Sequence, residues 1–148
     1  MKVTMILADY AQVADGKLTI VGGGWSVTGP APTPFAIALL FEVPWDQANV
    51  KQRFRLDLVD ADGHVVFMPR EDEGEDAVAL EGEFETGRPP GLKPGTTLSV
   101  PIAFNLPGPP IPPGGRYEWR LTVNGESDEN WNLPFSTRDE AEPETAGP

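Results

Sequence analysis

The residues in this sequence that could do chemistry are mostly carboxylates. Asp57, Asp60 and Asp62 lie close together in the chain, and the acidic loop 70–76 follows them. Calcium takes about six to eight oxygen ligands, which loop carboxylates can supply, so these residues are candidate calcium ligands. The spacing is not that of an EF-hand loop, and Asp-Ala-Asp-Gly is also typical of a tight turn. We therefore favour a solvated turn and expect neither a bound metal nor another cofactor.

Three further carboxylates, Glu81, Glu83 and Glu85, alternate along one predicted strand. Such neighbours on a strand face lie roughly 7 Å apart, a spacing that a glycosidase could use. A catalytic pair needs two different environments to separate its pKa values, and three glutamates facing water lack them. We expect these glutamates to pair with arginines of a neighbouring strand, or to protect a sheet edge from aggregation. The candidate arginines are Arg53, Arg55, Arg116 and Arg120.

Nucleophilic catalysis finds no support in the residue types. The chain has no cysteine and one histidine, His64. It therefore lacks a thiol nucleophile, a zinc–thiolate site and a pair of histidine ligands. The sequence also has no Gly-x-Ser-x-Gly elbow, which serine hydrolases of the α/β type use. We therefore expect a protein that is not an enzyme.

The charge of the chain limits its partners. With 11 basic and 23 acidic side chains, the 148 residues carry a net charge of −12. Such a charge repels nucleic-acid phosphates and anionic membrane surfaces. No apolar run approaches the roughly 20 residues that span a bilayer, and the first ten residues lack the apolar core of a signal peptide. We expect a cytoplasmic protein that binds neither nucleic acid nor membrane.

The elements that must position these side chains are strands, because alternation with a period of two dominates the sequence. A short helical turn is expected at 44–50. The pattern predicts one domain over 1–137, an antiparallel β-sandwich of about eight or nine strands with immunoglobulin-like, Greek-key connections. The acidic tail 138–148 has too few apolar residues to pack and is expected to be disordered. The expected strands are 3–8, 17–27, 35–43, 52–60, 64–68, 77–86, 97–106, 116–123 and 131–137.

Two glycine-rich segments have structural explanations. Tyr117 follows the loop Pro112 to Gly115 and opens a strand. That arrangement resembles the tyrosine corner, in which the phenol donates a hydrogen bond to upstream backbone; the alternative is a polyproline ligand. Gly22 to Gly24 interrupt a predicted strand just before Trp25. We expect a bulge or an aromatic ring over bare backbone there, rather than a ligand cradle.

Several apolar residues are candidates for contact with a partner. The strand 35–43 is apolar on both faces, so Ala36, Ala38 and Leu40 need a second cover, which a partner chain or a second copy could supply. Trp45 follows Pro44 at the tip between two strands, where an aromatic residue often contacts a partner. Trp45 could equally fold back and cap the end of the sandwich. Trp25 is a further contact candidate.

Three stretches resemble a known family. They run from Leu7 to Trp25, over Val43-Pro44-Trp45, and from Gly82 to Leu92. Together they resemble a family of small bacterial proteins known only as a domain of unknown function. The resemblance covers most of residues 3–125 and implies a bacterial, cytoplasmic origin. It implies no reaction, cofactor or site residue.

We therefore expect a non-enzymatic module that binds another protein or a copy of itself, as a homo-oligomer. The alternative is a loop-based module that binds calcium or carbohydrate through Trp45 or the aspartates.

Overall fold

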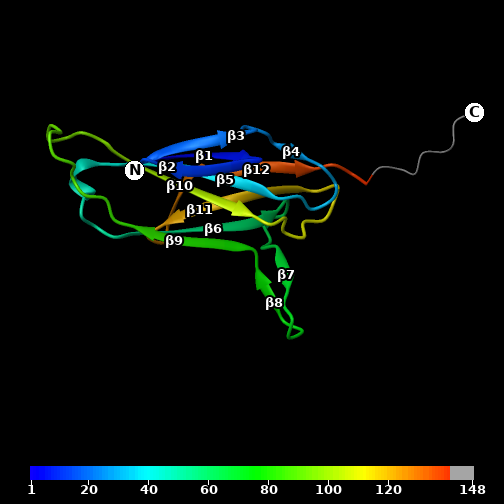
Figure 1. Cartoon of the computed structure of the whole chain (residues 1–148). Coiled ribbons are helices and arrows are strands. Elements are labelled where there is room, and N and C mark those ends of the chain that lie inside the picture. Colours follow the sequence, from blue (N-terminus) through cyan, green and yellow to red (C-terminus); the bar gives the residue numbers. More distant parts are fainter. Residues whose placement is uncertain (141–148) are drawn as a thin grey trace, which may run out of the picture.

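The computed structural model describes residues 1–140. Within them the chain forms strands β1 to β12 and one 3-10 turn, η1, which follows Pro44 as expected (Figure 1). The all-β class is confirmed, whereas an immunoglobulin-like arrangement stays a prediction. The elements are β1 (Lys2–Ala8), β2 (Tyr10–Ala14), β3 (Lys17–Val21), β4 (Val27–Thr28), β5 (Phe35–Val43), η1 (Trp45–Gln47), β6 (Gln52–Asp60), β7 (Phe67–Pro69), β8 (Glu75–Ala77), β9 (Ala79–Phe84), β10 (Leu98–Leu106), β11 (Arg116–Val123) and β12 (Glu126–Thr137).

The strands form two main sheets and two hairpins. One sheet has the order β1-β5-β10 and the other the order β4-β12-β11-β6-β9. All neighbours in these sheets are antiparallel except β4, which runs parallel to the end of β12. The separate hairpins are β2–β3 and β7–β8, and the second projects away from the rest of the molecule (Figure 1).

One hydrophobic core joins the two main sheets. Phe41 in β5 lies 5.1 Å from Phe54 in β6 and 4.8 Å from Phe84 in β9, measured between ring centroids. Trp119 in β11 is fully buried in the same core. Alternation places these side chains on the inner faces, because successive residues of a strand point to opposite sides.

The outer face of the β1-β5-β10 sheet is covered by the chain itself. Ala36 and Ala38 are 0% and 2% exposed and pack with Ala8 and Ala11 under the β2–β3 hairpin. Ala36 and Ala38 thus have the second cover that was expected, but the chain itself supplies it and not a partner. Their small side chains let the hairpin backbone lie close to the sheet. Leu40 lies further along β5 and remains half-buried.

The β2–β3 hairpin also shows that the expected strand 17–27 had the wrong bounds. That segment is divided into β3 and the short β4, with Gly22 to Ser26 between them, and β2 was not predicted. The expected strand 64–68 is reduced to β7, after a single bridge between Val59 and Val65. Of the expected disordered tail, 141–148 lie outside the described residues. No helix in the described range is long and apolar enough to cross a membrane.

Asn105 in β10 holds the β2–β3 hairpin on the sheet. Its Nδ2 donates to the carbonyl of Ala11 at 2.7 Å, and its Oδ1 accepts from the Ala11 N–H at 3.3 Å. The side chain thus replaces the partner strand that β2 lacks on this side.

Replacing Asn105 by alanine is expected to loosen the hairpin locally. Loss of both hydrogen bonds should cost about 1 kcal/mol and raise the exchange rate of the Ala11 amide far more than that of core amides. Amide hydrogen exchange measures both effects. Thr19→Ala, on the exposed strand β3, is the control, and equal exchange at Ala11 in both variants would refute the role of Asn105.

Candidate functional site

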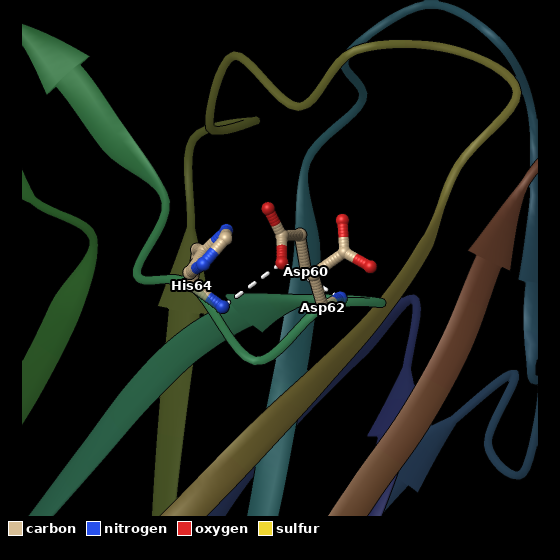
Figure 2. Close-up of side chains that lie close together, drawn as sticks. All are labelled: Asp60, Asp62 and His64. Atoms are coloured by element: carbon tan, nitrogen blue, oxygen red, sulfur yellow. Dashed lines mark hydrogen bonds between the residues drawn. The ribbon is translucent and has the colours of Figure 1, made fainter.

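The candidate aspartates do not converge as a set. Asp57 lies within β6, where its carboxylate accepts a hydrogen bond from Arg55 Nε at 2.8 Å. Asp60, Asp62 and His64 instead meet at the turn after β6, with one ligand atom of each within 4.8 Å of the others (Figure 2). The candidate metal ligands in the structure are therefore Asp60, Asp62 and His64, and Asp57 is not one of them. Among the acids of the loop 70–76, Asp72 and Asp76 each form an ion pair with Arg70 at 3.1 Å.

The turn at Asp60 already uses part of this carboxylate. Asp60 Oδ1 accepts from the backbone N–H groups of Asp62 and His64, each at 2.9 Å (Figure 2). Gly63 has φ of +79°, which the turn requires and glycine adopts at little cost. The arrangement agrees with the expected tight turn. It also offers two carboxylates and an imidazole, a donor set that suits a divalent transition metal better than calcium.

The glutamates of β9 pair with arginines of β6, as one of the two alternatives predicted. Glu83 forms an ion pair with Arg53, with 3.5 Å between Oε2 and Nε, and Glu81 forms an ion pair with Arg55. The pKa of Arg55 is raised, first by its hydrogen bond to Asp57 and then by the charges around it. These side chains line a groove of about 580 Å³ on the outer sheet face. Because the charges are balanced in pairs, the groove offers no unmatched acid for catalysis.

The predicted tyrosine corner is confirmed. Tyr117 Oη donates to the carbonyl of Pro112 at 3.1 Å, and Thr137 Oγ1 donates to the same carbonyl at 2.9 Å. A Cβ on Gly115 would lie 2.7 Å from Tyr117 Oη, so glycine leaves room for the phenol. The loop from Pro112 to Gly115 is therefore held by β11 and β12.

Tyr117→Phe is expected to lower the free energy of unfolding by about 1 kcal/mol at neutral pH. Burial, followed by the charge of Asp60, raises the pKa of Tyr117 in the folded protein. Because the pKa is higher in the folded state, the neutral phenol stabilises the fold at pH values below the unfolded-state pKa of ~10. This stability is lost as the pH rises through the folded-state pKa. Urea unfolding from pH 8 to 11 should therefore show a steeper alkaline loss in the wild type than in Tyr117→Phe.

The control is Tyr10→Phe, since Tyr10 is exposed and its hydroxyl donates only to nearby Gln12. This variant should keep the wild-type alkaline slope. If both phenylalanine variants lost the slope equally, the buried phenol of Tyr117 would not be its cause.

The glycines before Trp25 are explained by two close contacts other than an aromatic ring. A Cβ on Gly22 would collide with the carboxylate of Asp9, and one on Gly23 would lie 2.6 Å from an Ile20 methyl group. Of the two expected alternatives, the aromatic ring is not found at these glycines, and in place of a bulge the strand itself ends at Val21 and the next begins at Val27. Trp25 packs edge-on against Phe35 at 5.6 Å and Phe135 at 6.2 Å. It thus extends the core, and most of its contacts are internal.

Trp45 forms a defined cluster with Arg88. The Arg88 guanidinium carbon lies 4.8 Å from the centroid of the Trp45 ring, a cation–π contact. The same guanidinium donates from Nη2 and Nε to the Trp45 carbonyl at 2.8 and 3.2 Å. One arginine therefore fixes both the backbone of η1 and one face of the indole. Sequence reasoning missed Arg88, although Val43-Pro44-Trp45 and the stretch from Gly82 to Leu92, which contains Arg88, were both among those that resemble a known family.

Trp45 also lines an open groove of about 590 Å³. Its polar side chains include Glu42 and Asp46, together with Lys2, whose Nζ lies 3.8 Å from Glu42 Oε2. Asp46 forms no ion pair within residues 1–140. Trp45 also packs against the hydrophobic core, which agrees with the alternative that it folds back on the end of the sandwich. The groove thus combines a partly buried aromatic ring with two carboxylates, the Lys2 ammonium and the amino-terminal Met1. The remaining lining residues are Met1, Pro44, Gly95 and Thr97.

Comparisons with known proteins place the chain in a family. No curated protein and no solved structure gives a significant match. The segments that suggested an uncharacterised family include Val43 to Trp45 and Gly82 to Leu92, which the Trp45–Arg88 contact brings together. The model of a family of unknown function, DUF6941, matches residues 3–136, and the chain belongs to this family.

Proposed function

We propose that this protein is a non-enzymatic binding module that recognises another protein through the groove at Trp45. One observation carries the proposal: Arg88 fixes Trp45 at the edge of an open groove. Large aromatic residues dominate the energy of many interfaces, and a side chain already held in place loses less entropy on binding. The paired charges on the other large groove give no comparable support for catalysis.

Photo-crosslinking in the cells that make the protein tests this proposal. A photoreactive residue at Thr97, which lines the groove, should yield a discrete covalent adduct with one protein. The same residue at Thr19, on the exposed β3 strand, is the matched control and should not. Trp45→Leu combined with the Thr97 probe should abolish the adduct while the thermal melt confirms folding. Equal adducts from both positions, or none from Thr97, would overturn the proposal.

The partner in this proposal is a different protein. The own-chain cover of Ala36 and Ala38 removes the main reason for self-assembly, and two chains of charge −12 repel each other. Light scattering after size exclusion should give 16.0 kDa. A stable dimer at micromolar concentration would favour self-assembly instead.

A second candidate function is metal binding at Asp60, Asp62 and His64, because their ligand atoms lie within 4.8 Å of one another. A site filled to 100 times its Kd should add about 2.7 kcal/mol to the free energy of unfolding. Melts with Mn²⁺, Ni²⁺, Zn²⁺ or Ca²⁺ measure this. His64→Ala should remove a transition-metal shift, and no shift at millimolar metal would reject the site.

The proposal includes an immunoglobulin-like arrangement and a cytoplasmic location. The tyrosine corner between Pro112 and Tyr117 supports the first. The acidic composition, which disfavours contact with anionic membrane surfaces, supports the second. Fractionation of the producing cells tests the location, and recovery outside the cytoplasm would refute it.

A further inference from the structure

One edge of the larger sheet ends without a partner strand. β9 is the last strand in the order β4-β12-β11-β6-β9 and lies along the lower side of the body in Figure 1. The Leu58 N–H of β6 donates to the Val78 carbonyl at 3.0 Å, and bonded residues alternate along an antiparallel pair. The even-numbered residues of β9 therefore direct their backbone groups at β6. The odd-numbered residues, Ala79, Glu81 and Glu83, direct theirs outward, where no other backbone group of residues 1–140 pairs with them.

The other ends of the two main sheets are interrupted. β10 carries Pro101, and β12, of which β4 covers only the end, carries Pro134. Proline has no N–H to donate, and natural sheets use it to keep an edge from pairing. On β1, the Leu7 carbonyl already accepts from the Gly24 N–H at 2.8 Å. β9 contains no proline and keeps one register along β6, so its edge stays regular.

The charges on β9 select which strand can join it. Glu81 and Glu83 form ion pairs with Arg55 and Arg53 on the side of β6. Their side chains remain 66% and 54% exposed, so each carboxylate is also accessible from the open edge. Opposite charges directly across a strand pair stabilise it, and like charges destabilise it. A second copy of β9 would place glutamate beside glutamate, whereas a basic strand would continue the alternation of sign.

We propose that the edge of β9 binds an extended segment of another protein as an additional antiparallel strand. The segment carries lysine or arginine at alternate positions, opposite Glu81 and Glu83, with apolar residues between them. These apolar residues cover Leu80 and Phe84, which pack against the core and are still partly exposed. In strand addition the backbone hydrogen bonds give affinity and the side chains give selectivity. This surface goes beyond the groove at Trp45 and does not depend on it.

Titration of the ¹⁵N-labelled full chain with a short peptide tests the inference. The probe is acetyl-Thr-Val-Lys-Val-Lys-Val-Thr-amide, and its matched control has both lysine backbone nitrogens methylated, which keeps the charge and removes the two donors that face β9. The probe should shift the amide signals of Glu81 and Glu83 saturably and slow their hydrogen exchange. We expect the methylated peptide to bind at least about tenfold more weakly. Equal binding of the two peptides would overturn strand addition.

Two variants with the same change in net charge test the selectivity. Glu83→Gln should weaken binding of the lysine peptide about three- to fivefold, because the charge opposite one lysine is lost. Asp15→Asn, in the turn of the β2–β3 hairpin, should change it by less than about twofold, since a distant exposed charge is screened. Equal losses in both variants would show general attraction to an acidic protein and overturn the basic ligand.

A backbone variant tests the edge without a change in charge. Ala79→Pro removes an N–H that points outward and makes no bond to β6, so the thermal melt should stay close to that of the wild type. Binding of the lysine peptide should fall at least about fivefold. Unchanged binding in this folded variant would place the peptide elsewhere and overturn the inference.

Two further outcomes separate this inference from the proposed function. A covalent adduct from the Thr97 probe, combined with no shift at Glu81 and Glu83, would refute only the β9 site. Saturable shifts at these two amides without an adduct at Thr97 would support the β9 site and refute the groove at Trp45. Shifts of the same amides on raising the concentration of the chain alone would overturn the inference in favour of a second copy.

Discussion

Phe41→Ala is expected to lower the free energy of unfolding by about 3–5 kcal/mol, the usual cost of truncating a buried aromatic residue. Phe41 is 0% exposed and contacts rings from the opposite sheet, Phe54 at 5.1 Å and Phe84 at 4.8 Å between centroids. Its removal leaves a cavity where the sheets meet, because the surrounding strands cannot collapse fully into the space. Urea unfolding, followed by tryptophan fluorescence, measures the change in the midpoint and in the slope.

The control for this cavity is Val21→Ala, because Val21 is 54% exposed at the end of β3. We expect the control to change the free energy of unfolding by less than about 0.5 kcal/mol. A loss below about 1 kcal/mol in Phe41→Ala would mean that the two sheets are not joined through this ring.

Gly82→Ala is expected to destabilise the protein by about 1–3 kcal/mol. Gly82 in β9 lies opposite Phe54 in β6, and a Cβ at this position would lie 2.5 Å from the ring of Phe54. That ring is buried between Phe41, Phe84 and Phe104, so it has little room to move. The clash outweighs the roughly 0.5–1 kcal/mol that alanine normally gains over glycine within a strand. Thermal and urea unfolding measure the net change.

Gly87→Ala is the matched control, since its Cβ would meet only the side-chain oxygen of Asn49, at 3.7 Å. It should be neutral or slightly stabilising. In the Phe54→Leu background the cost of Gly82→Ala should fall, because the ring that causes the clash is gone. An unchanged cost in that background would assign the effect to the β9 backbone instead.

The strands that the sequence predicted best either alternate cleanly or are an unbroken apolar run between two prolines. The predicted ranges 35–43, 52–60 and 116–123 agree with the bounds of β5, β6 and β11. These strands have a continuous buried face, and Pro34 and Pro44 mark the ends of β5. A regular apolar face indicates packing against a core, so such strands can be predicted from the sequence alone.

The β2–β3 hairpin could not be predicted in the same way. Its inner face is made of Ala11, Val13, Leu18 and Ile20, and Val13 remains 44% exposed. The contact that holds it, between Asn105 and the backbone of Ala11, joins residues 94 positions apart. Nothing local in either segment signals this pairing, so the sequence indicates that β5 needs a second cover but not that the chain itself supplies it.

The candidate sites show the same difference between features that depend on neighbouring residues and features that depend on residues far apart in the chain. Asp57 and Asp60 are three positions apart on one strand, so their side chains point to opposite faces and could not share an ion. Local alternation would have excluded Asp57 from the set. Trp45 was identified from its position after Pro44, but Arg88 lies 43 residues away and its role depends on the fold.

The place of β12 in the sheet determines when this protein can fold during synthesis. β12 is the last strand within residues 1–140, yet it lies between β4 and β11. A nascent chain that has emerged as far as Leu106 holds all of β1, β5 and β10 but lacks Trp119 and the two strands that join β4 to β6. Its aromatic core would still face water on one side. The fold can therefore be completed only after residue 137 has left the ribosome, and until then the incomplete core exposes apolar surface of the kind that promotes aggregation.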